Sequence, residues 1–76
     1  MGSKSLDVLR VASLPNLSLE RTVAYKAACE RWSEKAVVAK FEELTRRGLI
    51  TYGVSARTGW LTEKGKQILD IRRQQA

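Results

Sequence analysis

One helical period near the middle of the chain constrains the fold more than any other feature. Val37, Phe41 and Leu44 fall at positions i, i+4 and i+7, so their side chains share one face of a helix. Gly48 follows at i+11, where a residue in the left-handed conformation can end the helix. The spacing therefore predicts a helix over residues 34–47 with this apolar face buried.

The residues after this helix predict a short hairpin and a closing helix. Residues 49–52 are rich in types that favour strands, and residues 60–61 predict a short returning strand. The intervening segment 53–59 contains two glycines and predicts a turn. In the last helix, Ile68 and Ile71 are expected to face inward, with Leu69 beside them.

Two further helices are predicted in the first half of the chain. The first is expected from Ser5 to Ser13, because a proline at position 15 disfavours the helical conformation in the residue before it. The second is expected from Leu19 to about Arg31, with a cap at Asn16 or Ser18. Leu19, Val23 and Ala27 are expected to share its apolar stripe, with Ala24 and Ala28 beside it.

The length of 76 residues is enough for one small domain. We expect a single domain over residues 1–76. Within it, residues 1–4 are expected to be a tag remnant or a disordered start, and residues 73–76 a frayed tail.

The sequence offers little chemistry for catalysis or for a cofactor. It contains no histidine, so a serine or cysteine nucleophile would lack its commonest base. The single cysteine, Cys29, cannot form an internal disulfide, and no Cys or His cluster is present to bind a metal. No apolar run approaches 18 residues. The sequence therefore predicts a cytoplasmic binding module that is not an enzyme, has no cofactor and no metal, and binds neither a membrane nor an evident small-molecule ligand.

The formal net charge of +6 favours a polyanionic partner such as a nucleic acid. A positive surplus of this size can equally serve solubility alone. The charge therefore selects nucleic acid as the first partner to consider, without excluding the simpler interpretation.

The order of predicted elements, together with the residues that form them, resembles a winged helix, and most closely the MarR-type transcriptional regulators. The resemblance is carried by residues 37–44 (VVAKFEEL), 46–50 (RRGLI), Arg57 and 61–65 (LTEKG). It implies a recognition helix over 34–47 and a wing over 53–59. The expected fold class is α+β, mainly α: a winged helix-turn-helix with three helices, a two-stranded wing hairpin and a C-terminal helix.

The resemblance has two departures. MarR-type proteins carry additional dimer-forming helices, and this chain has about half their length, so their dimerisation and ligand sensing do not carry over. Ser55 replaces the usual acidic residue two positions before the wing arginine. Small phage-type or plasmid-type bacterial regulators with a minimal winged helix fit the length better.

If Phe41 marks the buried side of the recognition helix, Ala36 and Ala39 point outward, with Glu43 and Arg46 farther along the same face. Small side chains there would let the helix enter a major groove of double-stranded DNA. Lys35 and Lys40 would flank this face and contact phosphates.

Two further arginines are candidate DNA contacts. Arg57 is expected at the tip of the wing, beside a minor groove or the backbone. Arg31, just before the recognition helix, is a candidate phosphate contact. Tyr52 and Trp60 are expected to pack the wing as a cross-strand pair.

Two alternatives to DNA binding are compatible with the sequence. The basic side chains can be ordinary solvated residues, and Glu34, Glu42 and Glu43 place negative charge on the same helix. The domain can then be a winged-helix protein-interaction module with an acidic partner. A lone winged helix has a small footprint, so a homodimer is possible.

Overall fold

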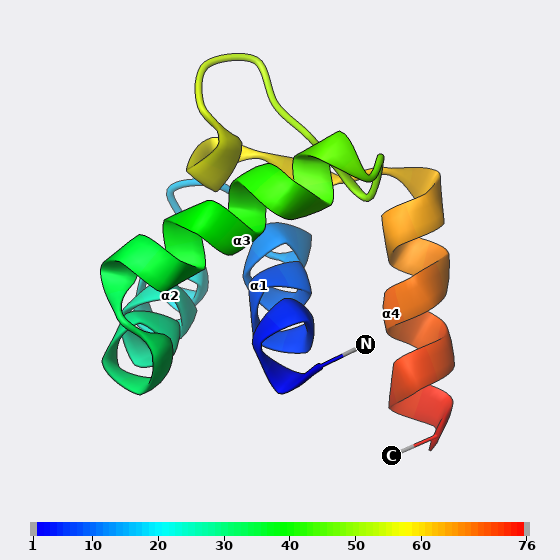
Figure 1. Ribbon diagram of the computed structural model, residues 1–76, viewed down its shortest axis with the longest axis horizontal. Coiled ribbons are helices and arrows are strands. Elements are labelled where there is room, and N and C mark those ends of the chain that lie inside the picture. Colours follow the sequence, from blue (N-terminus) through cyan, green and yellow to red (C-terminus); the bar gives the residue numbers. More distant parts are fainter. Residues whose placement is uncertain (1, 76) are drawn as a thin grey trace.

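The computed structural model describes residues 2–75 and is mainly helical, with one small sheet (Figure 1). Its elements are α1 (Ser3–Ser13), α2 (Leu19–Trp32), α3 (Glu34–Arg46), β1 (Ile50–Thr51), the 3-10 helix η1 (Ala56–Thr58), β2 (Trp60–Leu61) and α4 (Glu63–Gln75). The strands are antiparallel. The fold is therefore α+β and mainly α, as the sequence predicts.

The core lies where α3 crosses α1 and α2, below the sheet (Figure 1). Val37, Phe41 and Leu44 are fully buried, which confirms the helical period. They pack with apolar residues of α1 and of the sheet region, and with α4 through Leu69. Deeply buried core residues outside α3 are Val8, Leu9, Val11, Ala12, Leu49, Ile50 and Leu69.

Local sequence signals mark the boundaries of the helices. Leu14, before Pro15, is extended and caps α1. The Ser18 hydroxyl accepts a hydrogen bond from the backbone of Arg21 and caps α2. Gly48 follows α3 with φ of 78°, in the left-handed region that favours glycine.

The predicted buried stripe of α2 is wrong. Leu19, Val23 and Ala27 are exposed, and the opposite face of the helix meets the core. That face carries Arg21, Ala24, Tyr25, Ala28 and Trp32. Both faces contain apolar residues at helical spacing, so the period alone did not identify the buried one.

The predicted inward face of α4 also needs correction. Leu69 is buried, Ile68 only partly so, and Ile71 is exposed. Gly65 lies on the buried side of this helix and packs directly on the backbone carbonyl of Leu49, so a Cβ at this position would collide with that carbonyl. This close approach sets the rotation of α4 and brings Leu69 inward.

The sheet is shorter than predicted. Ile50 pairs with Leu61 and Thr51 with Trp60, so Tyr52 lies outside the paired strand. The expected cross-strand pair of Tyr52 and Trp60 is therefore wrong. Both aromatic side chains are about half exposed.

The ends of the domain are more helical than predicted. Helix α1 begins at Ser3, and α4 continues to Gln75. Met1 and Ala76, which belonged to the predicted tag remnant and frayed tail, lie outside the described residues. None of the helices within the described part of the chain combines the length and apolar character needed to cross a bilayer.

Candidate nucleic-acid interface

Helix α3 is positioned by a connection of one residue. Ser33 follows α2 directly and precedes α3, with φ of 82°. Its hydroxyl accepts a hydrogen bond from the backbone N–H of Ala36, which caps α3. Helix-turn-helix units usually have three or four residues at this place, so the turn here is unusually tight.

The exposed side of α3 carries a stripe of four residues that we call the α3 stripe. It consists of Lys35, Ala39, Glu42 and Arg46, which fall at i, i+4, i+7 and i+11. Ala36 and Glu43, expected on the outermost face, are only partly exposed. The centre of the free surface is therefore rotated from the predicted face towards Lys35 and Glu42.

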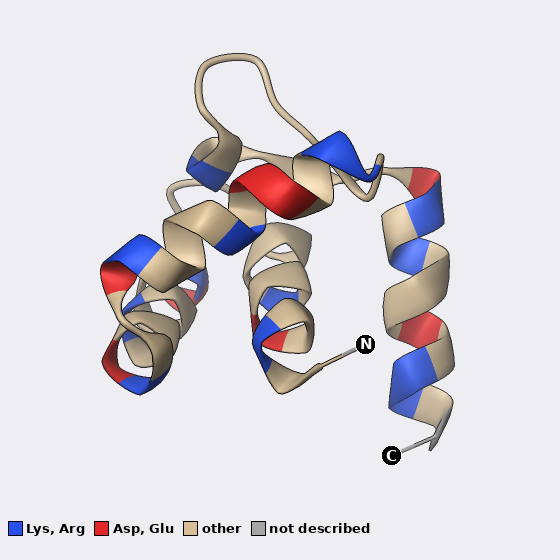
Figure 2. Cartoon of the chain, in the orientation of Figure 1, with Lys and Arg blue, Asp and Glu red and all other residues tan. Residues whose placement is uncertain are grey.

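Charge is distributed unevenly along this helix. Figure 2 shows basic segments towards both ends of α3 and an acidic segment between them. The first turn also carries exposed Glu34, and Arg47 is exposed just beyond the last turn. The α3 stripe is thus basic at its ends and acidic at Glu42.

Lys40, which the sequence predicts as a phosphate contact, is paired within the protein. Its Nζ donates a hydrogen bond to Oε2 of Glu43 at 2.7 Å, and only 21% of its side chain is exposed. The hydrogen bond and charge of Lys40 lower the pKa of the Glu43 carboxyl, which keeps this residue ionised. Each side chain therefore neutralises the other. Glu43 pairs with Lys40 rather than with an arginine of the last turn.

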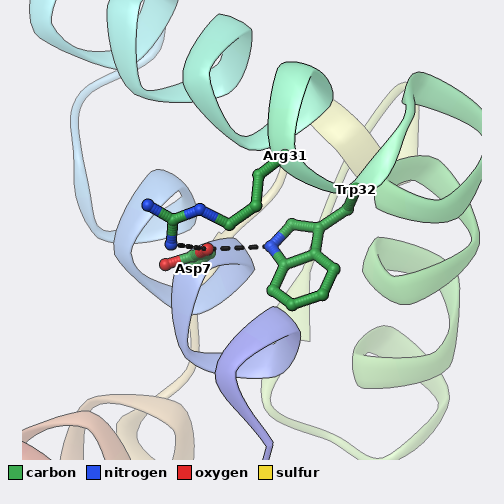
Figure 3. Close-up of polar contacts among 3 residues, drawn as sticks. All are labelled: Asp7, Arg31 and Trp32. Atoms are coloured by element: carbon green, nitrogen blue, oxygen red, sulfur yellow. Dashed lines mark hydrogen bonds and ion pairs between the residues drawn. The ribbon is translucent and has the colours of Figure 1, made fainter.

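Arg31 is also paired within the protein. Its guanidinium donates to Oδ2 of Asp7 in α1 at 2.9 Å, and Nε1 of Trp32 donates to the same oxygen at 2.9 Å (Figure 3). This arrangement ties the end of α2 to α1 and gives the Asp7 carboxylate two donors. Arg31 thus contributes to packing between helices, which argues against its predicted role as a phosphate contact.

Arg57 does not lie at the tip of a projecting wing. It belongs to η1, which folds back against α3, and the exposed apex of the loop carries Val54 instead. The carbonyls of Arg57 and Thr58 accept hydrogen bonds from Arg21 and Asn16, each at 2.7 Å. These bonds draw the second half of the loop towards the start of α2.

Ser55 has a local structural role at the start of η1. Its side chain and that of Thr58 cap the short helix reciprocally. A hydroxyl at this position thus holds the loop in shape without the acidic residue of the MarR-type pattern.

Arg21 is a structural residue that the sequence analysis missed. It is 6% exposed, and its guanidinium donates to the carbonyls of Leu14 and Arg57. Burial lowers the pKa of its guanidinium below the ordinary value. An arginine among apolar residues gives no sequence signal of burial, because its partners are backbone carbonyls distant in the chain.

A cleft runs between the α3 stripe and the loop after β1. Its volume is about 370 Å³, and its lining includes Glu42 and Arg46 from the helix and Tyr52 and Val54 from the loop. The loop therefore borders the C-terminal half of the α3 stripe without burying it. The N-terminal half, with Lys35 and Ala39, is open.

Comparisons with protein-family models, with curated proteins and with solved structures found no match. Within residues 2–75, no group of three or more His, Cys, Asp or Glu side chains is placed to bind a metal ion.

Proposed function

We propose that the protein is a small transcriptional regulator of the winged-helix type that binds double-stranded DNA through α3. The observation that carries the proposal is the α3 stripe, in which exposed cations lie at both ends of one helical face. The order of elements from α1 to α4 is compatible with a winged helix of the MarR type, and the loop from Gly53 to Gly59 would be its short wing.

The spacing of the cations suits a major groove. Lys35 and Arg46 are eleven positions apart on one face, which corresponds to about 16 Å along the helix axis. The major groove of B-DNA is about 12 Å wide, so these side chains can reach phosphates on both walls. Such contacts fix the orientation of the protein on the duplex without reading its sequence.

The centre of the α3 stripe would face the base edges. Ala39 is small enough to allow close approach and can contact a thymine methyl group. Glu42 can accept a hydrogen bond from a cytosine amine, whereas it would repel a phosphate. The acidic residue would therefore add selectivity at the cost of some affinity.

A titration of fluorescently labelled duplexes tests this proposal. Anisotropy would be measured for the whole chain at 50 and 200 mM KCl, with a pool of random 24-base-pair duplexes. With about four phosphate contacts, affinity should fall about a hundredfold between these salt concentrations. The double variant Lys35→Ala/Arg46→Ala should bind more weakly, with a salt slope lower by about two.

A matched control removes the same charges from other elements. Arg10 in α1 and Lys66 in α4 are both exposed, so Arg10→Ala/Lys66→Ala loses one arginine and one lysine elsewhere. This variant should keep the salt slope of the parent. Salt-insensitive binding, or the same loss of slope in both double variants, would reject α3 as the DNA-binding element.

A further inference from the structure

A surface that DNA binding does not explain lies at the start of α2. Leu17, Leu19 and Val23 are 102%, 78% and 59% exposed, and we call these three residues the α2 apolar patch. Leu19 and Val23 are neighbours at i and i+4 on the helix. Apolar residues that cluster on a surface in this way are typical of a protein contact, whereas single exposed ones are ordinary.

Leu17 is exposed in a conformation that its side chain disfavours. Its φ is 66°, in the left-handed region that suits glycine or asparagine. It precedes the cap residue Ser18, where an apolar side chain often packs onto the helix, but here it makes no such contact. Strain combined with full exposure points to a role outside the folding of the domain.

The turn that presents Leu17 is held firmly. The side chain of Asn16 donates to the Thr58 carbonyl at 2.7 Å, and Arg21 donates to the Leu14 carbonyl at 3.1 Å. These bonds fasten the turn on both sides of Leu17. The α2 apolar patch is therefore preorganised, which reduces the entropy lost when a partner binds.

A groove of about 270 Å³ adjoins the α2 apolar patch at Leu17. The charged residues that line it are Arg21 and Arg57, and its lining is mostly apolar. The Tyr25 hydroxyl, which is buried, has no hydrogen-bond partner among the described residues. Because that hydroxyl is shielded from solvent, the group that a partner can reach is the exposed Arg57, so the groove offers a positive charge to an incoming acceptor.

The charged residues along α2 indicate which edge of a partner should be acidic. At 100° per residue, Thr22, Tyr25 and Lys26 lie on the groove side of the Leu19–Val23 line, and Glu20 lies on the other side. Glu30 and Glu34 lie farther along, where they line a separate pocket and not the groove. The edge next to the groove is thus basic, which favours carboxylates on the corresponding edge of a partner.

We propose that the α2 apolar patch docks an acidic amphipathic helix of another protein. Apolar side chains of that helix cover Leu17, Leu19 and Val23, and one of its carboxylates enters the groove to accept from the guanidinium of Arg57. The geometry is that of a helix laid on an apolar surface. This site is separate from the α3 stripe and does not depend on DNA binding.

Two synthetic 18-residue peptides test the proposal. Both carry the same leucine stripe, and one has glutamate where the other has glutamine along one edge of that stripe. Amide chemical shifts of the whole ¹⁵N-labelled chain would be followed by NMR during titration. The glutamate peptide should bind about tenfold more tightly, with saturable shifts at residues 17–25 and 57–58.

Variants separate the two parts of the site. Leu19→Ser/Val23→Ser should weaken binding of both peptides at least about tenfold, whereas the control Val54→Ser/Ile71→Ser, which also removes two exposed apolar side chains, should not. Arg57→Gln removes the exposed positive charge of the groove, and it should reduce the preference for glutamate over glutamine.

Several outcomes would overturn this proposal. They are the absence of saturable shifts, shifts confined to α3, and equal affinity for the two peptides. Shifts of the α2 apolar patch that depend on protein concentration alone would assign it to a second copy of the chain. Displacement of the peptide by duplex DNA, with shifts at the same residues, would assign it to nucleic acid.

Discussion

Two non-glycine residues among residues 2–75, Ser33 and Leu17, have left-handed backbone conformations, and their roles differ. Ser33 has φ of 82° at the junction of α2 and α3, where its hydroxyl caps the following helix. Leu17 has φ of 66° in the turn before α2, where its side chain contacts solvent. The strain at Ser33 is offset by a cap, whereas that at Leu17 has no compensation inside the domain.

Replacing Leu17 with asparagine should therefore stabilise the protein. Asparagine tolerates the left-handed region, so Leu17→Asn should raise the free energy of unfolding by about 1 kcal/mol. Urea denaturation followed by circular dichroism measures this change. Leu19→Asn, at a helical position of similar exposure, is the control and should give no gain; a loss of stability in Leu17→Asn would show that the turn is not strained.

At the scale of elements, one buried arginine joins three segments. The guanidinium of Arg21 in α2 binds the carbonyl of Leu14 at the end of α1 and that of Arg57 in η1. The same side chain thus fixes the turn before α2 and the loop after β1. The ion pair of Arg31 with Asp7 joins only α2 and α1, and its arginine side chain is largely exposed.

The variant Arg21→Ala should consequently destabilise the protein by about 2 kcal/mol, because two carbonyls lose a charged donor and the core loses packed methylene groups. Arg31→Ala should cost less than about 1 kcal/mol, as expected for a largely exposed ion pair. Thermal unfolding of the two variants makes the comparison. Equal costs would contradict the assignment of Arg21 as the residue that ties these segments together.

The ion pair of α3 predicts a pH effect in a defined direction. Lys40 lowers the pKa of the Glu43 carboxyl in the folded protein below its ordinary value of 4.5. A depressed folded-state pKa stabilises the fold above the unfolded-state pKa, and this contribution is lost as pH falls through the folded value. Lys40→Ala should raise the pKa of Glu43, measured by NMR titration of its side-chain carboxyl; an unchanged value would show that the pair does not persist in solution.

At the scale of the whole molecule, the count of 14 lysines and arginines overstates the cations available to a polyanion. Lys40 and Arg31 are paired with Glu43 and Asp7, and Arg73 approaches Asp70 at 4.0 Å. The exposed positive charge of α3 and its C-cap is concentrated at Lys35, Arg46 and Arg47. Affinity for DNA should therefore depend on these few side chains more than on total charge.

Releasing Lys40 should strengthen DNA binding under this proposal. Glu43→Gln removes one negative charge and the partner of Lys40, so affinity for any duplex should rise about threefold to tenfold, with a salt slope larger by about one. The labelled-duplex titration measures both quantities. Asp70→Asn on α4 changes the net charge equally and is the control; an equal gain in that variant would mean that only total charge matters.

Sequence patterns alone determined the helices, their caps and one buried face. Regular spacing of Val37, Phe41 and Leu44 identified the core side of α3, and proline, serine and glycine marked the helix ends, because these signals act within a few residues. The positive charge and the winged-helix resemblance likewise predicted, from the residues alone, that α3 is the DNA-binding helix.

Tertiary structure decided which of two apolar faces of α2 is buried, and which cations remain unpaired. Leu19 and Val23 look like core residues in the sequence, but α1 and α3 pack on the face that carries Ala28 and Arg21. Arg31 and Lys40 look free until Asp7 and Glu43 are placed beside them. Helical period gives the spacing of residues on a face, whereas burial and pairing depend on which other elements pack there.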